Sequence, residues 1–321
     1  MKTRVAVVYG GRSGEHEVSL RSAQSIIEAM DAGKYEVLHY VISKEGTWSP
    51  RPILPEPGGN PGIDVVFPVL HGTFGEDGTV QGLLELADLP YVGAGVLASS
   101  VSMDKEMMKR VATANGLPVV QYVVAACSGM WSIPFGFPMF VKPANLGSSV
   151  GISKARDGEE LTAAIELAGK YDRKVIVERA ITGREFECAV LGNDKPVASA
   201  PCEILPSREF YDYEDKYLLD QAQTVIPADL PPEHIATIQR LAVECYQAVG
   251  CEGMARVDFL LETATSDLYI NEINTIPGFT SISMYPKMWE YSGLPMPKLI
   301  DRLIELALER HASRTSLRYS R

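Results

Sequence analysis

Three oxygen-bearing side chains in the last third of the chain have the types and spacing of a divalent-cation site. Glu272 and Asn274 stand two residues apart in the strand-like run YINEINTIPGFT, so both point from one face of a strand. Asp258 lies in the preceding run MARVDFLLE, and the polar segment ETATSD between the runs indicates a hairpin loop that turns near residues 264–265. That turn sets Asp258 opposite Glu272, at a separation of about 5 Å.

Two carboxylates at this separation repel each other unless one is protonated or a cation lies between them. Mg²⁺ suits Asp258, Glu272 and Asn274 because it prefers hard oxygen ligands and usually combines one or two carboxylates with substrate phosphates. Arg256 shares the face of Asp258. The alternative interpretation of Glu272 and Asn274 is a solvated polar edge of the sheet.

A second group of residues has the types needed to bind phosphate. Lys142 ends a strand in FVKPANLGSSVGIS, and the small residues 147–151 follow it. Small residues let backbone N–H groups close around an anion, and Lys142 adds a point charge. The motif G-x-x-x-x-G-K-[ST] is absent from the sequence, which disfavours a P-loop fold. The alternative is a flexible hairpin loop without a ligand.

Three further segments have the composition of loops that border a substrate. Glu15, in YGGRSGEHEVS, follows the first strand, where it either binds a substrate ammonium group or caps the helix that begins there. His71 ends another strand and enters a Gly-rich loop, with a purely structural role as the alternative. The aromatic and charged run REFYDYEDKYLLD is typical of a lid over a site, or else of an ordinary surface loop.

Alternating strands and helices are expected to position the first of these residues. Residues 1–96 contain strand-like runs in RVAVVYG, YEVLHYVIS, IDVVFPVLHG and LPYVGAG, with helical patterns between them. This βαβ alternation predicts a parallel sheet with flanking helices. A second unit, 97–180, opens with a helical run over residues 99–116. Within this run, Asp104–Lys105 is the signal for a helix start and Gly116 is the signal for a helix end.

The third unit is expected to span residues 181–312. It contains the lid at about 205–222, a long helix in PPEHIATIQRLAVECYQAVG, the hairpin of the candidate metal ligands, and a last helix in PMPKLIDRLIELALERH. The basic and polar residues 313–321 are expected to form a frayed tail.

Composition narrows the class of protein. The chain has 321 residues, 46% hydrophobic and 22% charged, which predicts a globular protein of two or three domains. The net charge is −11 and no block of Lys or Arg stands out, so a nucleic-acid partner is not expected. The five cysteines form no CxxC motif and predict free thiols in a reducing cytosol. We expect no signal peptide, because the N-terminal apolar run is short and lacks a cleavage site. We expect no membrane partner, because no apolar run approaches the roughly 20 residues of a membrane span, and we expect a cytoplasmic location.

Taken together, the motifs resemble one known family. The segments GGRSGEHEVSL, LHGTFGEDGTVQG, DK, KPANLGSSVGIS, EFYDYEDKY, ARVDFLL and NEINTIPGFT are similar to those of the D-alanine–D-alanine ligases of the ATP-grasp superfamily, in order and over nearly the whole chain. The resemblance implies an α/β (α+β) three-domain ATP-grasp fold, in which an N-terminal parallel α/β domain is followed by two α+β domains that grip ATP. It further implies ATP as co-substrate, Mg²⁺ or Mn²⁺ as a pair of ions, a homodimer, and ligation of two D-alanines through an acyl phosphate for peptidoglycan synthesis.

The resemblance also assigns roles to individual residues. Those implied for ATP are the phosphate-binding Lys105 and Lys142, Glu178 for the adenine amino group with the backbone of Ala180 and Ile181 nearby, Glu185 for the ribose, and Phe210 and Lys216 in the lid. Those implied for the metal are Asp258, Glu272 and Asn274. Those implied for the first D-alanine are Glu15, Ser148 and Tyr217, with His71 beside them. Arg256 and the backbone N–H of Gly278 are implied for the tetrahedral intermediate, and Ser283 with the backbone of Met284 for the second D-alanine.

Two rival functions stay open at this point. A D-alanine–D-lactate ligase would share the fold, but such relatives tend to depart from the Lys-Tyr pair of the lid, which is intact here as Lys216 and Tyr217. A catalytically silent nucleotide-binding protein would be expected to lose some of Lys142, Arg256 and the two acidic metal ligands, and all of these are present. The sequence does not identify the base that deprotonates the second D-alanine.

Overall fold

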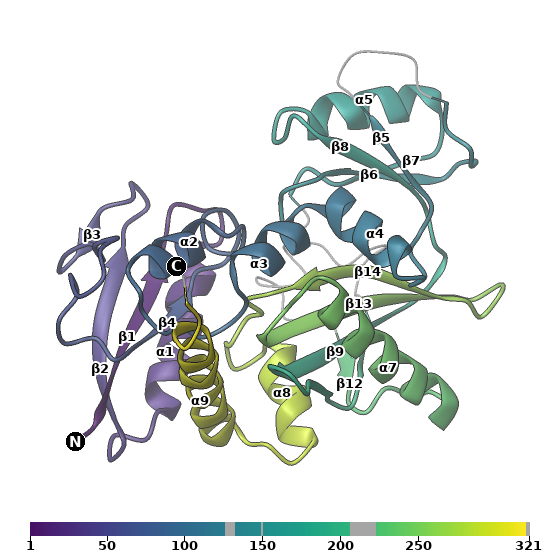
Figure 1. Cartoon of the computed structure of the whole chain (residues 1–321). Coiled ribbons are helices and arrows are strands. Elements are labelled where there is room, and N and C mark those ends of the chain that lie inside the picture. The colour runs from purple at the N-terminus through teal and green to yellow at the C-terminus, as the bar shows by residue number, and fades with distance from the viewer. Residues whose placement is uncertain (126–131, 149, 206–222, 319–321) are drawn as a thin grey trace.

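The computed structural model describes residues 1–125, 132–148, 150–205 and 223–318. These residues form three β-sheets with helices packed on and between them (Figure 1). One sheet belongs to the N-terminal part of the chain, a second to the middle and the largest to the C-terminal part. The mixed α/β architecture is the one that the sequence predicts.

The N-terminal sheet is mainly parallel, as the βαβ alternation predicts. Its order is β3-β2-β1-β4, with β1 parallel to β2 and to β4, and β3 added antiparallel at the edge. Its elements are β1 (Thr3–Gly10), α1 (His16–Ala29), β2 (Tyr35–Ile42), β3 (Trp48–Ser49), β4 (Val65–Val69), α2 (Thr79–Leu86) and α3 (Val96–Met103). The apolar run of β1 is buried because the sheet is covered on both faces. The closing strand expected in LPYVGAG is wrong: Tyr91 makes a single bridge to Val66, and Gly93, at φ +93°, then turns the chain away.

The middle sheet is antiparallel throughout, in the order β5-β8-β6-β7. Its elements are β5 (Tyr122–Ala125), β6 (Met139–Pro143), β7 (Ser153–Ala155), α5 (Gly158–Ala168) and β8 (Val175–Arg179). Helix α5 packs its apolar face on this sheet, with Leu161 and Ile165 against Val141 and Val177. The sheet therefore has one face on α5 and leaves the other to a neighbouring part of the chain.

The C-terminal sheet carries the hairpin of the candidate metal ligands. Its order is β12-β11-β9-β13-β14, with β10 paired to β9. Its elements are β9 (Gly183–Gly192), β10 (Val197–Ala198), β11 (Cys202–Leu205), β12 (Gln223–Val225), α7 (Pro232–Ala248), β13 (Gly253–Glu262), β14 (Leu268–Asn274), α8 (Met284–Tyr291) and α9 (Met296–Thr315). Helix α7 packs on one face through Ile238, Leu241 and Tyr246.

Asp104 starts a helix, as the sequence predicts, but the residues before it form a separate one. The extended backbone of Asp104 ends α3, and its carboxylate accepts hydrogen bonds from the backbone N–H groups of Glu106 and Met107 at the start of α4 (Lys105–Ala114). Met108 of α4 packs in one apolar cluster with Tyr246 of the C-terminal part. Helix α4 therefore lies against the C-terminal sheet and faces the middle one.

The last helix returns to the N-terminal sheet (Figure 1). Leu299 and Leu303 of α9 share an apolar cluster with Val7 and Phe67. Helix α9 runs on to Thr315, so the expectation of a frayed tail from residue 313 is wrong for its first three residues. Arg314 in that last turn forms an ion pair with Glu85 of α2, which fixes the end of the helix.

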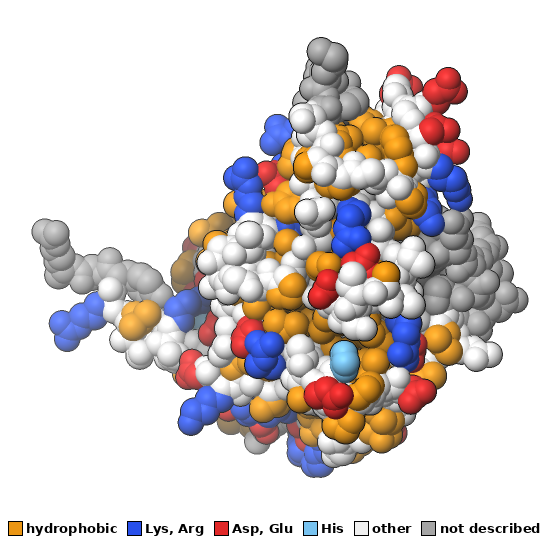
Figure 2. Space-filling model, turned by 90° about the vertical axis from the view of Figure 1, so that its right-hand side faces the viewer, with side chains coloured by type: hydrophobic (Ala, Val, Ile, Leu, Met, Phe, Trp, Pro, Cys, Tyr) orange, Lys and Arg blue, Asp and Glu red, His pale blue; other side chains and the backbone are white. Residues whose placement is uncertain are grey.

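Surface charge is mixed on the face that Figure 2 shows. Basic and acidic side chains are interspersed there, and the residues drawn in colour form no continuous basic patch on that face. Within the described ranges, no helix is both long and apolar enough to cross a bilayer. The domain boundaries at residues 96, 180 and 312 stay predictions.

Candidate active site

The candidate metal ligands meet on the hairpin of β13 and β14, as the sequence predicts. The antiparallel register pairs Asp258 with Glu272 and Arg256 with Asn274. Asp258 and Glu272 are therefore direct cross-strand neighbours, whose side chains lie close on one face of the sheet. This register confirms the geometric part of the prediction.

A β-bulge next to this pair changes where the side chains of β14 point. Phe259 pairs with Ile270, although the residue before it pairs with Glu272, so Asn271 is the extra residue of the bulge. Asn271 and Glu272 both line the same cavity, whereas neighbours in a regular strand face opposite sides. The Asn271 Oδ1 atom lies 3.4 Å from Lys142 Nζ. The bulge thus brings an amide to the lysine that the sequence assigns to phosphate.

A third carboxylate, on β9, extends the pair into a row across three strands. Glu187 lies opposite Asp258 on the other side of β13. Arg256 donates through Nε and Nη2 to the two carboxylate oxygens of Asp258 at 2.7 and 2.6 Å, and its Nε lies 3.3 Å from Glu187 Oε2. Burial disfavours the charged guanidinium, but Asp258 and Glu187 outweigh it and raise the pKa of Arg256. Arg256 is therefore a fixed positive charge beside the row.

The donor set fits a hard divalent cation whose coordination a substrate completes. Among the residues that the structure describes, no group of three or more His, Cys, Asp or Glu side chains is arranged to hold a metal. Asp258, Glu272 and Asn274 instead offer two carboxylates and an amide, a partial oxygen set of the kind that Mg²⁺ takes with substrate phosphates. Asp258 is also held by Arg256, so a bound cation would share this carboxylate with the guanidinium.

Two lysines approach this row from other elements. Lys105, the first residue of α4, donates from Nζ to Leu146 O at 2.6 Å and lies 3.6 Å from Glu272 Oε2. Lys142, on β6, places Nζ 2.7 Å from Glu178 Oε2. Burial lowers the pKa of Lys142, but Glu178 outweighs it and raises the pKa above the usual value. The sequence-predicted phosphate ligands are thus brought to the same region of the molecule.

The larger cavity, of about 420 Å³, lies between the middle and C-terminal sheets. Its lining includes the predicted nucleotide ligands Lys105, Lys142, Glu178, Ile181 and Glu185. Ala180 is not part of the lining, and its backbone N–H donates to Pro138 O at 3.1 Å. Burial disfavours ionised Glu178, but Lys109 and Lys142 outweigh it and lower the pKa of that carboxyl to about 2.

The smaller cavity, of about 100 Å³, is lined by Glu15, His71 and Ser148, which are the described residues among those predicted for the first D-alanine. Ser148 donates to Glu15 Oε1 across the cavity. Glu15 also stands at the N-cap position of α1, as the alternative predicts, but its side chain makes no capping hydrogen bond there. His71 is held by Ile276 O and Ser22 Oγ, each at 3.0 Å, so it is both a buried structural residue and part of the lining.

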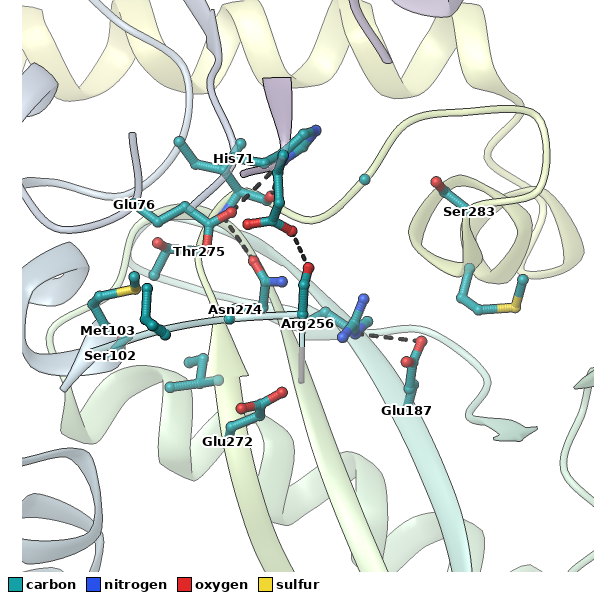
Figure 3. A pocket seen from close by; sticks show the side chains of 18 of the residues that line it. His71, Glu76, Ser102, Met103, Glu187, Arg256, Glu272, Asn274, Thr275 and Ser283 are labelled. Carbon is teal, nitrogen blue, oxygen red and sulfur yellow. Dashed lines mark hydrogen bonds and ion pairs between the residues drawn. The ribbon is translucent and has the colours of Figure 1, made fainter. Parts of the chain in front are cut away.

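His71 is paired with a carboxylate that the sequence did not single out. Glu76 Oε1 lies 3.6 Å from His71 Nδ1; the His71 side chain is buried and that of Glu76 is mostly buried. Burial alone would lower the pKa of His71, but Glu76 outweighs it and raises that pKa; burial also raises the pKa of Glu76. Figure 3 shows Glu76 and His71 on one side of the cavity and Ser283 on the opposite side, with Arg256 between them.

Gly278, Ser283 and Met284 close the far end of the smaller cavity. The Ser283 hydroxyl accepts from Thr280 N at 3.0 Å and lies 2.8 Å from Thr280 Oγ1. A Cβ added at Gly278 would approach Ser283 Oγ to 2.7 Å, so a larger residue there would require the Ser283 side chain to move. The loop before α8 therefore presents backbone and hydroxyl groups to the cavity.

The two cavities share one wall. Lys105, Ser148, Glu187 and Glu272 line both of them. A nucleotide in the larger cavity and a small polar substrate in the smaller one would therefore meet at the carboxylate row. Phe210, Lys216 and Tyr217, and with them the predicted lid, lie outside the residues that the structure describes.

Three site residues escaped the sequence analysis, although each carried a signal. Lys109 follows Lys105 by four residues, which places both on one face of a helix. Glu187 follows Glu185 by two residues in a strand, so the two share a face. Glu76 stands five residues after His71 in a loop, where spacing carries no directional information, and only the fold could have paired them.

Comparison with known proteins identifies the family. The model described as the D-ala D-ala ligase C-terminus matches residues 111–305, and that of the D-ala D-ala ligase N-terminus matches 4–58 and 54–94. The chain belongs to the D-alanine–D-alanine ligase family. The D-alanine--D-alanine ligase of Solibacter usitatus is 69% identical over the full length of both chains, and D-alanine--D-alanine ligase A of Escherichia coli K12 is 45% identical over 99% of each.

Solved structures of this family have the same fold. The D-alanine-D-alanine ligase of Coxiella burnetii superposes with a TM-score of 0.87 at 40% identity, over 98% of this chain and 96% of that one. The VanG D-Ala:D-Ser ligase of Enterococcus faecalis superposes with a TM-score of 0.86 at 35% identity, over 96% and 100%. The predicted ATP-grasp fold is confirmed.

Proposed function

We propose that the chain joins two D-alanines to D-alanyl-D-alanine at the expense of ATP, through an acyl phosphate, for peptidoglycan synthesis. The observation that carries this proposal is the shared wall of the two cavities, where Lys105, Ser148 and Glu272 face both. ATP use follows from membership of the family. A cavity of nucleotide size beside one of amino-acid size is what a phosphoryl transfer between the two ligands requires.

The first step activates a carboxylate, which by itself is a poor acyl donor. Glu15 would hold the ammonium group of the first D-alanine, with Ser148 fixing the Glu15 carboxylate. Lys105 and Lys142 would position the triphosphate so that its γ-phosphoryl group meets the D-alanine carboxylate at the shared wall. Asp258, Glu272 and Asn274 would hold Mg²⁺ or Mn²⁺, which supplies neutralisation of phosphate charge.

The second step is attack by the amine of the second D-alanine. Ser283 and the backbone of Met284 would take its carboxylate at the far end of the smaller cavity. Arg256 and the backbone N–H of Gly278 also face this cavity and would stabilise the charge that develops on the tetrahedral intermediate. Phosphate then leaves from the acyl carbon. The proposal assigns no base for the amine.

The metal count, the oligomeric state and the location belong to the same proposal. We infer a pair of bound metal ions, a homodimer and a cytoplasmic enzyme, on the family resemblance. Equilibrium sedimentation of the purified chain tests the dimer, and a monomer at micromolar concentration would contradict it.

The deciding experiment is phosphate release from ATP with identification of the product. D-alanine alone should release phosphate and yield the dipeptide, and D-alanyl-D-alanine should stay the main product when D-lactate or D-serine is added at equal concentration. Mixed ester or D-alanyl-D-serine as the main product would reassign the second substrate. No release in any mixture, in spite of nucleotide binding, would identify a silent nucleotide-binding protein.

A further inference from the structure

Lys109 is a lysine with no exposure to solvent. It lies on α4, four residues after Lys105, and it does not line either cavity. Its Nζ lies 3.0 Å from Glu178 Oε1 and 6.0 Å from the ring centre of Tyr122. Removing an ammonium group from water costs several kcal/mol unless a partner compensates it. Lys109 is therefore kept at a substantial cost, and Glu178 is the carboxylate that compensates it.

Glu178 is shared between two lysines with different access to the nucleotide cavity. Its Oε1 faces the sealed Lys109, and its Oε2 lies 2.7 Å from Lys142, whose side chain is 12% exposed and lines the cavity. On β8, Glu178 pairs with Tyr122 of β5 on one side and with Phe140 of β6 on the other, so aromatic side chains flank it. The Glu178 carboxylate is therefore almost inaccessible to water, and the two lysines compensate its negative charge.

This arrangement has a consequence for ligand binding. Lys142 can reach a phosphate group only by turning away from Glu178 or by sharing its charge with it. Without another cation, that movement would leave a buried carboxylate unpaired, which is strongly unfavourable. Lys109 cannot follow into the cavity, because its side chain is fully buried and does not line the cavity. It therefore keeps its ion pair with Glu178 while the ligand binds.

We propose that Lys109 is a positioning residue for the nucleotide: it is the permanent counter-ion of Glu178, and it thereby frees Lys142 for the phosphates and leaves Glu178 Oε2 as an acceptor for a base amino group. This inference rests on the proposed nucleotide role of the larger cavity. A purely structural Lys109 would affect the stability of the fold and leave the ligand affinities of the folded protein unchanged.

The first test compares Lys109→Met with Arg110→Met. Arg110 is the next residue of the same helix, its side chain is 65% exposed, and it pairs with Glu106, so the control removes the same charge from the surface. Binding of Mg·ADP and of Mg·tripolyphosphate, which has no base, is measured by calorimetry on folded protein. Lys109→Met should weaken both by at least about tenfold because Lys142 is then held by Glu178. Arg110→Met should stay within about threefold of the unmodified chain.

A double variant separates positioning from damage. In Lys109→Met/Glu178→Gln the carboxylate that would hold Lys142 is gone, so tripolyphosphate affinity should return to within about threefold of the unmodified chain. General damage to the site would leave the double variant as weak as Lys109→Met. If Lys109→Met does not fold, Lys109→Gln, which can still donate to Glu178 without a charge, is compared with the double variant in the same way.

The outcomes also separate this inference from the proposed function. Glu178→Gln should change the preference for ATP over GTP, because Glu178 is expected to accept from the adenine amino group. An unchanged preference, or no nucleotide binding by the unmodified chain, overturns the assignment of the larger cavity. A changed preference together with unaltered binding by Lys109→Met overturns the role of Lys109 alone.

Discussion

Replacement of Asp258 by Asn tests the metal assignment most directly. The change is isosteric and removes one negative charge from the row of three carboxylates at 187, 258 and 272. Arg256 forms an ion pair with Asp258, and Lys105 forms one with Glu272. It also takes one acceptor from Arg256, since the amide NH₂ cannot accept a hydrogen bond. We expect phosphate release to fall by at least about a hundredfold, the cost of losing one group that stabilises transferred charge.

The expected loss of stability follows from the contacts. Asp258 accepts two charge-assisted hydrogen bonds at 2.6 and 2.7 Å, and Asn keeps one of them. The lost bond is worth roughly 1.5–3 kcal/mol. Arg256 still has Glu187 at 3.3 Å, so the roughly 3–5 kcal/mol for stranding a buried charge does not apply. The melting temperature should fall by roughly 2–5 °C for a chain of 321 residues, and the protein should stay folded at 25 °C.

Asp301→Asn is a matched control far from the cavities. The Asp301 side chain is 12% exposed, as is that of Asp258, and it is bound by Lys34 Nζ at 2.6 Å and Tyr35 at 3.0 Å. This variant should lose similar stability and keep full activity.

The assay is phosphate release at rising Mg²⁺ concentration. In Asp258→Asn the concentration for half-maximal rate should rise at least about tenfold, since changes outside the ligand shell alone cost 10–100-fold in metal affinity. The reasoning is refuted if Asp258→Asn turns over within about threefold of the unmodified chain at equal Mg²⁺, or if Asp301→Asn loses as much activity as Asp258→Asn.

Three further predictions concern the substrate site, the buried ion cluster and the thiols. Ser148→Ala removes the donor to Glu15 and should raise the KM for D-alanine about tenfold or more with little change in the KM for ATP, because one hydrogen bond to a charged group is worth roughly 1.5–3 kcal/mol. Equal changes in both constants would count against the assignment. Because the folded-state pKa of Glu178 is depressed from 4.5 to about 2, its contribution to stability is complete above pH 4.5 and is lost as the pH falls towards 2. Unfolding followed from pH 6 to pH 2.5 should therefore show a steeper loss for the unmodified chain than for Glu178→Gln, and parallel curves would refute the ion cluster. The four cysteines at 188, 202, 245 and 251 are buried, and burial raises the pKa of each thiol, so the native protein should react with a thiol reagent at no more than one cysteine, Cys127, whereas the unfolded chain should react at all five; fast reaction of two or more native thiols would contradict the burial.

The elements near the candidate metal site were predictable because their signals are local. The period-2 pattern of β13 and β14 and the polar loop between them fix an antiparallel hairpin, and the turn position fixes the partner of Asp258. The sequence likewise predicted the start of α4 at Asp104, which is the N-cap residue of that helix. Patterns of this kind depend on residues within about fifteen positions of one another, where propensity and alternation act directly.

Elements whose placement depends on distant packing were not predictable in the same way. The last helix matched its pattern but carried no sign that Leu299 would pack against Phe67, more than two hundred residues earlier. The bulge at Asn271 shifts the register by one residue, and no residue type in β14 predicts a bulge at this position. The sharing of Glu178 by two lysines also depends on the way α4 faces the middle sheet.

The sequence by itself determined which side chains exist to do the chemistry and which of them share a strand or helix face, because side-chain direction repeats with a short period along the backbone. It thereby set the hairpin of Asp258 and Glu272, the lysines at 105 and 142, and the family. Only the tertiary structure decided that three sheets surround two adjoining cavities, that Glu187 joins the carboxylate row and that Glu76 backs His71. It also decided that Lys109 is buried on Glu178, because burial and charge compensation depend on the elements that fold against a residue and leave no trace in its immediate neighbours along the chain.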